Sequence, residues 1–166
     1  MSRTYTIVRR YWQEPVPDAD ADGLYVGRLH PPEQSRIIQA MSWWGFGTGI
    51  LGITHGKAPM GVCVMIGSGI ASMYWAKPTY GFRRRLDMAW VQFLMWWHLI
   101  AGFYSPARAT YYTITGLGVA SYIISWGLML RGYTWAAIYM HMLLTACANL
   151  SVTVLYTNPL PPSLFW

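Results

Sequence analysis

The sequence predicts an all-α, polytopic membrane protein, with about five transmembrane helices in a bundle behind an extended polar N-terminal tail. The first reason is composition, because 54% of the residues are hydrophobic and only 11% are charged. A soluble domain carries about 25% charged residues. The second reason is pattern, because apolar runs of membrane-spanning length follow one another after residue 36. Hydrocarbon offers the backbone no hydrogen-bond partners, so these runs are expected to be helical.

Three regions follow from this pattern. Residues 1–36 read as a polar tail, residues 37–156 as the transmembrane bundle and residues 157–166 as a Pro-rich C-terminal tail. A helix of about 20 residues crosses the hydrocarbon layer. The apolar runs have about that length, and the predicted spans are 37–55, 60–75, 87–104, 111–130 and 133–156.

Positive charges indicate the topology. With five spans, one side of the membrane holds only Lys57 and Arg108, and the other side holds ten cations. Positive residues gather on the cytoplasmic or matrix side, so we expect the N-terminus on that side and the C-terminus opposite. We expect no nucleic-acid binding, because the sequence shows no basic stripe on a soluble face. The ten cations are Arg3, Arg9, Arg10, Arg28, Arg36, Lys77, Arg83, Arg84, Arg85 and Arg131.

The basic loop between the second and third spans is expected to bind lipid. It contains Lys77 near its start and Arg83, Arg84 and Arg85 near its end. Such clusters fix topology and attract anionic headgroups. Bound lipids are therefore expected, and no soluble small-molecule substrate is expected.

Two histidines are candidate ligands for a cofactor. His98 and His141 are predicted near mid-membrane, within roughly 5 Å of the same depth, from their distance to the positive ends of their spans. Two neutral imidazoles at one depth could ligate a b-type haem or a chlorophyll-like pigment. They could equally hydrogen-bond to neighbouring helices, as Asn149 in the fifth span could.

Asp87 is the one carboxylate after Glu33. At the mouth of the third span it is expected to favour the helix dipole and to pair with the preceding arginines. The alternative is a proton or metal site. The sequence shows no phosphate-binding loop, nucleophile elbow, paired carboxylates or HExxH motif. We therefore expect no catalytic centre, and the two cysteines, Cys63 and Cys147, read as packing residues.

Residues 72–106 resemble a segment of the hemolysin III, adiponectin-receptor and alkaline-ceramidase superfamily. Ser72, Asp87 and His141 match polar residues of that family in kind, and residues 102–106 resemble its turn. The resemblance implies a membrane hydrolase or receptor with a three-histidine zinc site. Trp75 and Thr145 stand where two of those histidines belong. A catalytic zinc normally takes three protein ligands, so the resemblance implies a degenerate relative that has lost the metal.

The expected function is a non-catalytic accessory subunit of a large membrane complex. The complex is expected in an energy-transducing organelle membrane (respiratory, ATP synthase or photosynthetic), with the mitochondrial inner membrane as the leading location. The N-terminal sequence lacks the apolar core of a secretory signal, and its acidic residues argue against a cleavable presequence. Both tails are expected to dock on partner subunits. The alternatives are a degenerate hydrolase or receptor, a haem- or pigment-binding protein that uses His98 and His141, and a small transporter.

Overall fold

A computed structural model describes residue 30 and residues 32–78 and 81–164, and the described chain is helical with no β-strand. The all-α prediction is confirmed. Most of the predicted polar tail lies outside the described residues. Its last part differs from the prediction, because helix α2 (Pro32–Ser42) begins inside it. Pro32 at the first helical position and Glu33 in the first turn both favour a helix start.

The predicted span 37–55 is a helix interrupted at Trp43. It comprises most of α2 and all of α3 (Trp44–Thr54). Ser68 of the next helix donates its hydroxyl to the carbonyl oxygen of Ser42. The backbone N–H of Phe46 donates to the carbonyl oxygen of Trp43 instead, at 3.0 Å. A side chain inserted into the helical hydrogen-bond ladder is a recognised cause of such breaks.

Three predicted spans correspond closely to long helices. These are α4 (Ala58–Ala76), α6 (Arg108–Leu130) and α7 (Thr134–Thr157). Each is long and apolar enough to cross a membrane, which supports an integral membrane protein. A short 3₁₀ turn, η1 (Pro162–Leu164), follows α7.

The other two predicted spans differ from these three helices. The first is divided into two short helices, and the third is a long helix that is less apolar. Helices α2 and α3 have 11 residues each, which is about 16 Å per helix and half of the hydrocarbon thickness. Helix α5 (Phe82–Phe103) has 22 residues, but three arginines, Gln92 and His98 lower its hydropathy. It begins five residues earlier than predicted, because Gly81 adopts a φ of 131° and starts the helix there. Five spans remain a prediction.

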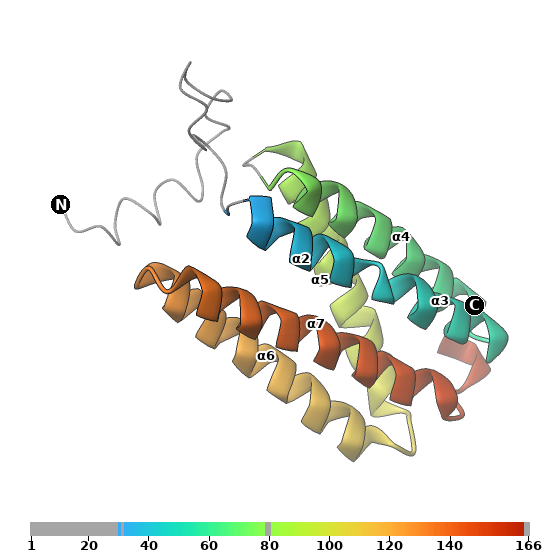
Figure 1. The fold of residues 1–166 in the computed structure, drawn as a ribbon. Helices are drawn as coiled ribbons and strands as arrows, with labels where there is room; N and C mark the ends of the chain where they lie inside the picture. Colours follow the sequence, from blue (N-terminus) through green and yellow to red (C-terminus); the bar gives the residue numbers. More distant parts are fainter. Residues whose placement is uncertain (1–29, 31, 79–80, 165–166) are drawn as a thin grey trace.

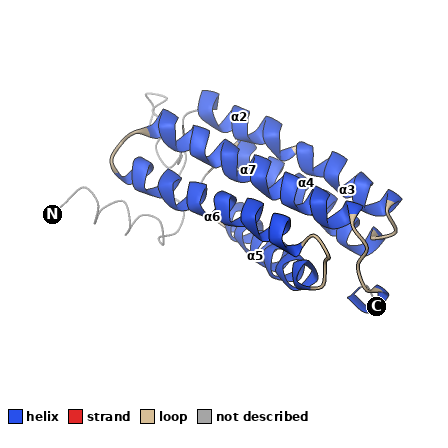
Figure 2. Cartoon of the chain, turned by 90° about the horizontal axis from the view of Figure 1, so that it is seen from below, coloured by secondary structure: helices blue, strands red, loops and turns tan. Residues whose placement is uncertain are grey.

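The helices run back and forth along one bundle (Figure 1). Helix α7 pairs with α6 on one side and contacts α2 and α3 on the other. Helix α4 lies against α2, α3 and α5. Figure 2 shows α5 and α6 on the side of the bundle opposite α2. Figure 1 also shows that α4 ends and α5 begins at the same end of the bundle as the start of α2. The connection between α6 and α7 lies at this end too.

We call this end the basic end, because six of the eight described Lys and Arg residues lie there. The described carboxylates also lie there, Glu33 in the first turn of α2 and Asp87 in the second turn of α5. The opposite end holds Lys57 and Arg108, and we call it the Lys57 end. The cations of the basic end are Arg36, Lys77, Arg83, Arg84, Arg85 and Arg131.

Each end has its own buried apolar cluster. At the Lys57 end, Met60, Ala101, Tyr111, Leu155 and Tyr156 pack together. At the basic end the cluster is smaller, and its members are Ile38, Tyr74, Trp75 and Ile138. The buried apolar residues therefore form two clusters, and the cluster at the Lys57 end draws on more helices.

Candidate functional site

His98 is fully engaged at the Lys57 end. Its side chain is buried, its Nδ1 lies 2.7 Å from the carbonyl oxygen of Leu94 and its Nε2 lies 2.9 Å from the hydroxyl oxygen of Tyr156. A carbonyl oxygen only accepts, so Nδ1 carries the proton and Nε2 accepts from the tyrosine. Both nitrogens are occupied, which is the structural polar contact that the sequence allowed as an alternative to ligation.

Lys57 joins the same region to the end of α7. Its Nζ donates to the carbonyl oxygen of Tyr156 at 2.6 Å and to that of His55 at 3.2 Å. Carbonyl oxygens at a helix C-terminus carry partial negative charge, which stabilises a cation. Burial lowers the pKa of the Lys57 ammonium below its usual value. The Lys57 side chain and the loop around His55 line one side of a pocket, and Pro159 and Leu160 line the other.

His141 lies in a different environment, near the basic end. Its ring stacks edge-on against Trp75, with centroids 5.0 Å apart, and faces Tyr122 at 6.5 Å. No described residue forms a hydrogen bond with its ring nitrogens. The imidazole of His141 is therefore held by aromatic packing.

His30 completes this group, although it was not among the predicted site residues. The ring centroids of His30 and Trp75 are 5.4 Å apart, and His141 packs on the same indole. Burial lowers the pKa of His30, and the Gln34 side chain partly offsets this by favouring the charged form. Neither Nδ1 of His30 nor Oε1 of Gln34 has a hydrogen-bond partner among the described residues. The Gln34 amide nitrogen donates to Thr134 of α7 at 3.1 Å.

The prediction that His98 and His141 share one depth is wrong. His141 lies 15 residues before Tyr156 on α7, which is about 22 Å along the axis, and His98 lies beside Tyr156. The earlier start of α5 moves His98 further from the basic end than predicted. The two imidazoles are not brought together as the axial ligands of one haem would be.

Three other predicted residues have different surroundings. Asn149 accepts from Thr48 of α3 at 2.8 Å and donates to the carbonyl oxygen of Thr145 at 2.9 Å, so it links helices. Ser72 is buried on α4, and Asp87 is buried on α5 near Arg84. Asp87 lies in the second turn rather than at the helix mouth, because α5 starts at Phe82. Within the described part of the chain, no three His, Cys, Asp or Glu side chains gather to hold a metal.

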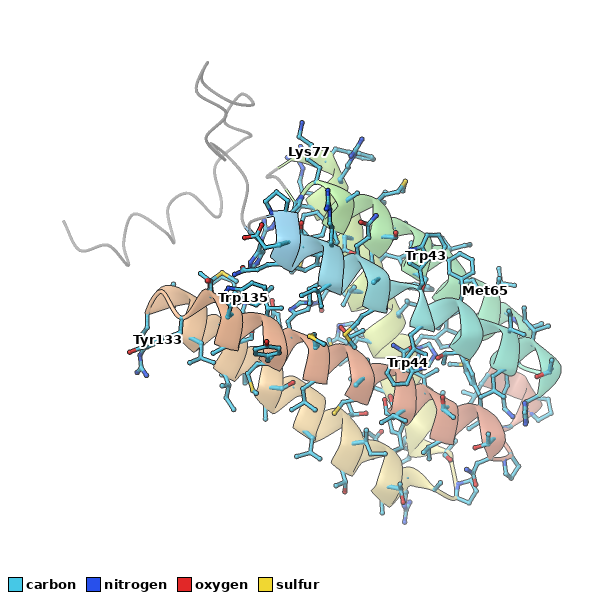
Figure 3. All side chains as sticks on the ribbon, in the orientation of Figure 1. Trp43, Trp44, Met65, Lys77, Tyr133 and Trp135 are labelled. Carbon is cyan, nitrogen blue, oxygen red and sulfur yellow. The ribbon has the colours of Figure 1, made fainter. Side chains whose placement is uncertain are left out.

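The predicted lipid-binding cations lie at the basic end. Arg83 and Arg85 are exposed in the first turn of α5. Figure 3 shows Lys77 at this end, with Tyr133 and Trp135 near the start of α7. Both aromatic side chains are exposed, as expected for residues at a membrane interface. Lipid binding by these cations remains a prediction.

The fold defines the class of protein as an all-helical membrane protein. Comparison with known proteins adds no family to this class, because no family model matches the sequence. No curated protein and no solved structure matches it either.

Proposed function

We propose that the chain is a non-catalytic subunit of a larger membrane assembly, and that α6 carries the surface on which a partner helix packs. One observation carries the proposal, a line of small exposed side chains on the face of α6 turned away from α7. The line advances by steps of four, three and four residues, so its members share one face. They are Ala109, Thr113, Gly116 and Ala120.

The opposite face of α6 shows how such residues are used. Gly118 is buried, and a Cβ added to it would lie 3.1 Å from Cβ of Cys147 on α7. A Cβ added to Gly116 would meet nothing within 4 Å. Small residues let helix backbones approach closely in lipid. Helix α6 therefore has one small face covered by α7 and a second one that is open.

The exposed surface of α5 differs from the small exposed line on α6 and resembles a surface that faces lipid. Its exposed side chains include the large hydrophobic groups of Phe93, Trp96 and Ile100. Acyl chains pack readily against such groups. The small exposed line on α6 is thus better suited to a protein partner than to lipid.

The narrower part of the proposal concerns location and topology. We infer five membrane crossings in an energy-transducing organelle membrane, the mitochondrial inner membrane in particular, with the basic end on the matrix side. The asymmetry of charge between the two ends supports this orientation. Labelling of single cysteines at Gly132 and at Pro159, after replacement of Cys63 and Cys147, tests it. Labelling of both sites from one side of the membrane contradicts it.

The subunit proposal is tested by native electrophoresis and mass spectrometry after extraction in a mild detergent. The wild-type protein is expected to migrate with other membrane proteins. The double variant Gly116→Leu/Ala120→Leu fills the open face and should migrate as the free chain with unchanged helical content. The control is Gly47→Leu on α3, whose glycine is equally open, and it should stay in the assembly. A wild-type protein that migrates alone contradicts the proposal.

A further inference from the structure

Four residues at the basic end form a cluster that the proposed subunit role does not use. We call His30, Gln34, Trp75 and His141 the imidazole cluster. Both imidazoles pack on the same indole, at centroid distances of 5.4 Å and 5.0 Å. His30 precedes α2, and Gln34 lies in the first turn of α2. Trp75 lies at the end of α4, and His141 belongs to α7. The cluster therefore joins three helices where α2 starts.

The polar atoms of this cluster are not satisfied. The His30 and Gln34 side chains are 6% and 1% exposed, which excludes bulk water. His30 Nδ1 and Gln34 Oε1 nevertheless lack partners among the described residues. Buried polar groups in proteins are paired in the great majority of cases. The Gln34 side chain favours the charged form of His30, so His30 Nδ1 beside Gln34 marks a place where a proton can bind.

Among the described residues, no carboxylate lies against the two imidazoles. Tyr122 of α6 faces His141, Tyr74 of α4 packs against Trp75, and neither side chain is acidic at neutral pH. Glu33 of α2 is exposed, as are the nearby cations Arg36 and Arg131. No described carboxylate contributes to the electrostatics of His30 or His141, whereas His30 acts on His141. A charge on one ring therefore opposes a charge on the other.

We propose that His30 and His141 form a proton-operated latch at the start of α2. With both rings neutral, the cluster closes, and the hydrogen bond from Gln34 to Thr134 and the packing of Ile38 fasten α2 to α7 and α4. A proton on either ring places an uncompensated charge among aromatic side chains. The start of α2 then separates from α4 and α7.

The direction of the response follows from the environment of His30. Burial lowers the pKa of His30 below 6.5, so the open form binds protons more readily than the closed form. The latch is closed above about pH 6.5. The closed form loses stability progressively as the pH falls below about 6.5 towards the lowered pKa of His30.

Hydrogen–deuterium exchange on the full chain in lipid nanodiscs tests the latch. After correction for intrinsic exchange, protection of residues 32–42 should fall at least about threefold between pH 7.5 and pH 5.5. His30→Gln and His141→Gln should each weaken this dependence, and the double variant should abolish it. The control His55→Gln removes an exposed imidazole at the other end and should respond like the wild type.

A second measurement needs no variant that perturbs folding. NMR of the wild-type chain with labelled histidine follows all four imidazoles, and His30 should titrate below the ordinary histidine pKa, in the same pH range over which α2 loses protection. Either of two results overturns the latch. One is protection of α2 that does not depend on pH, and the other is a response of the double variant equal to that of the wild type.

Discussion

At the Lys57 end, both nitrogens of His98 have partners within 3 Å, whereas at the basic end His30 and His141 have aromatic neighbours and few hydrogen bonds. The two ends also differ in how the helices meet. At the Lys57 end the backbones of α3 and α4 cross at Gly49 and Gly61. At the basic end large aromatic rings separate the helices. The molecule therefore combines a closely packed end with an end whose polar groups are left open.

This difference indicates which end is expected to move. Local opening requires little free energy where hydrogen bonds are few and packing is loose. The first turns of α2 have few hydrogen bonds to other helices and lie next to unpaired polar atoms, although Gln34 and Ile38 are fully buried. The end of α7 differs, because Lys57 and His98 both bond to Tyr156. His98 and His30 are buried to a similar extent. His98 stabilises the Lys57 end, whereas His30 is expected to respond to pH.

The largest expected effect comes from the helix crossing at the Lys57 end. A Cβ added to Gly61 would collide with the backbone carbonyl of Gly49 and lie 3.0 Å from the backbone nitrogen of Ile53. Gly61→Ala should therefore lower the free energy of unfolding in mixed micelles by about 2–3 kcal/mol. Gly69→Ala on the same helix meets nothing within 4 Å. It should be neutral or stabilising by up to about 1 kcal/mol, and equal losses in both variants would contradict the tight crossing.

A smaller loss is expected from the hydrogen bond between α5 and α7. Tyr156→Phe removes the hydroxyl that donates to His98 and leaves a buried nitrogen unpaired. The cost should be about 1–2 kcal/mol in the same unfolding measurement. Tyr139→Phe changes an exposed tyrosine of the same helix and should cost less than about 0.5 kcal/mol. An unaffected Tyr156→Phe variant would show that this bond does not stabilise the Lys57 end.

Local sequence was enough to predict most of the fold. The runs 60–75, 111–130 and 133–156 correspond to α4, α6 and α7 with ends that differ by at most three residues, because long apolar runs leave the backbone no alternative to a helix. The boundaries that failed depend on other signals. The start of α5 follows from Gly81, whose positive φ begins the helix before the arginines. The break at Trp43 comes from Ser68, 26 residues away, so no local pattern contains it.

The candidate site was harder to predict for the same reason. His141 was identified as a buried polar residue, but its neighbour Trp75 and its second neighbour His30 lie 66 and 111 residues away in the sequence. His30 stands in a Pro-rich polar segment, which suggests exposure. It is buried because the start of α2 packs on α4 and α7. Depth along a helix was also misjudged, because a five-residue error in the start of α5 moves His98 by about 7 Å.

The smallest expected effect is the most informative for the comparison of the two ends. His30→Phe keeps an aromatic ring against Trp75 and removes a buried nitrogen that has no partner. At pH 7.5 the free energy of unfolding should change by less than about 0.5 kcal/mol, because no hydrogen bond is lost. The same replacement at His98 breaks a bond to Tyr156 and should cost about 2 kcal/mol. Since burial lowers the pKa of His30, the His30→Phe variant should also become the more stable protein as the pH falls from 6.5 to 5. If His30→Phe is as costly as His98→Phe at pH 7.5, then the imidazole at the basic end has a partner, and the contrast between the two ends fails.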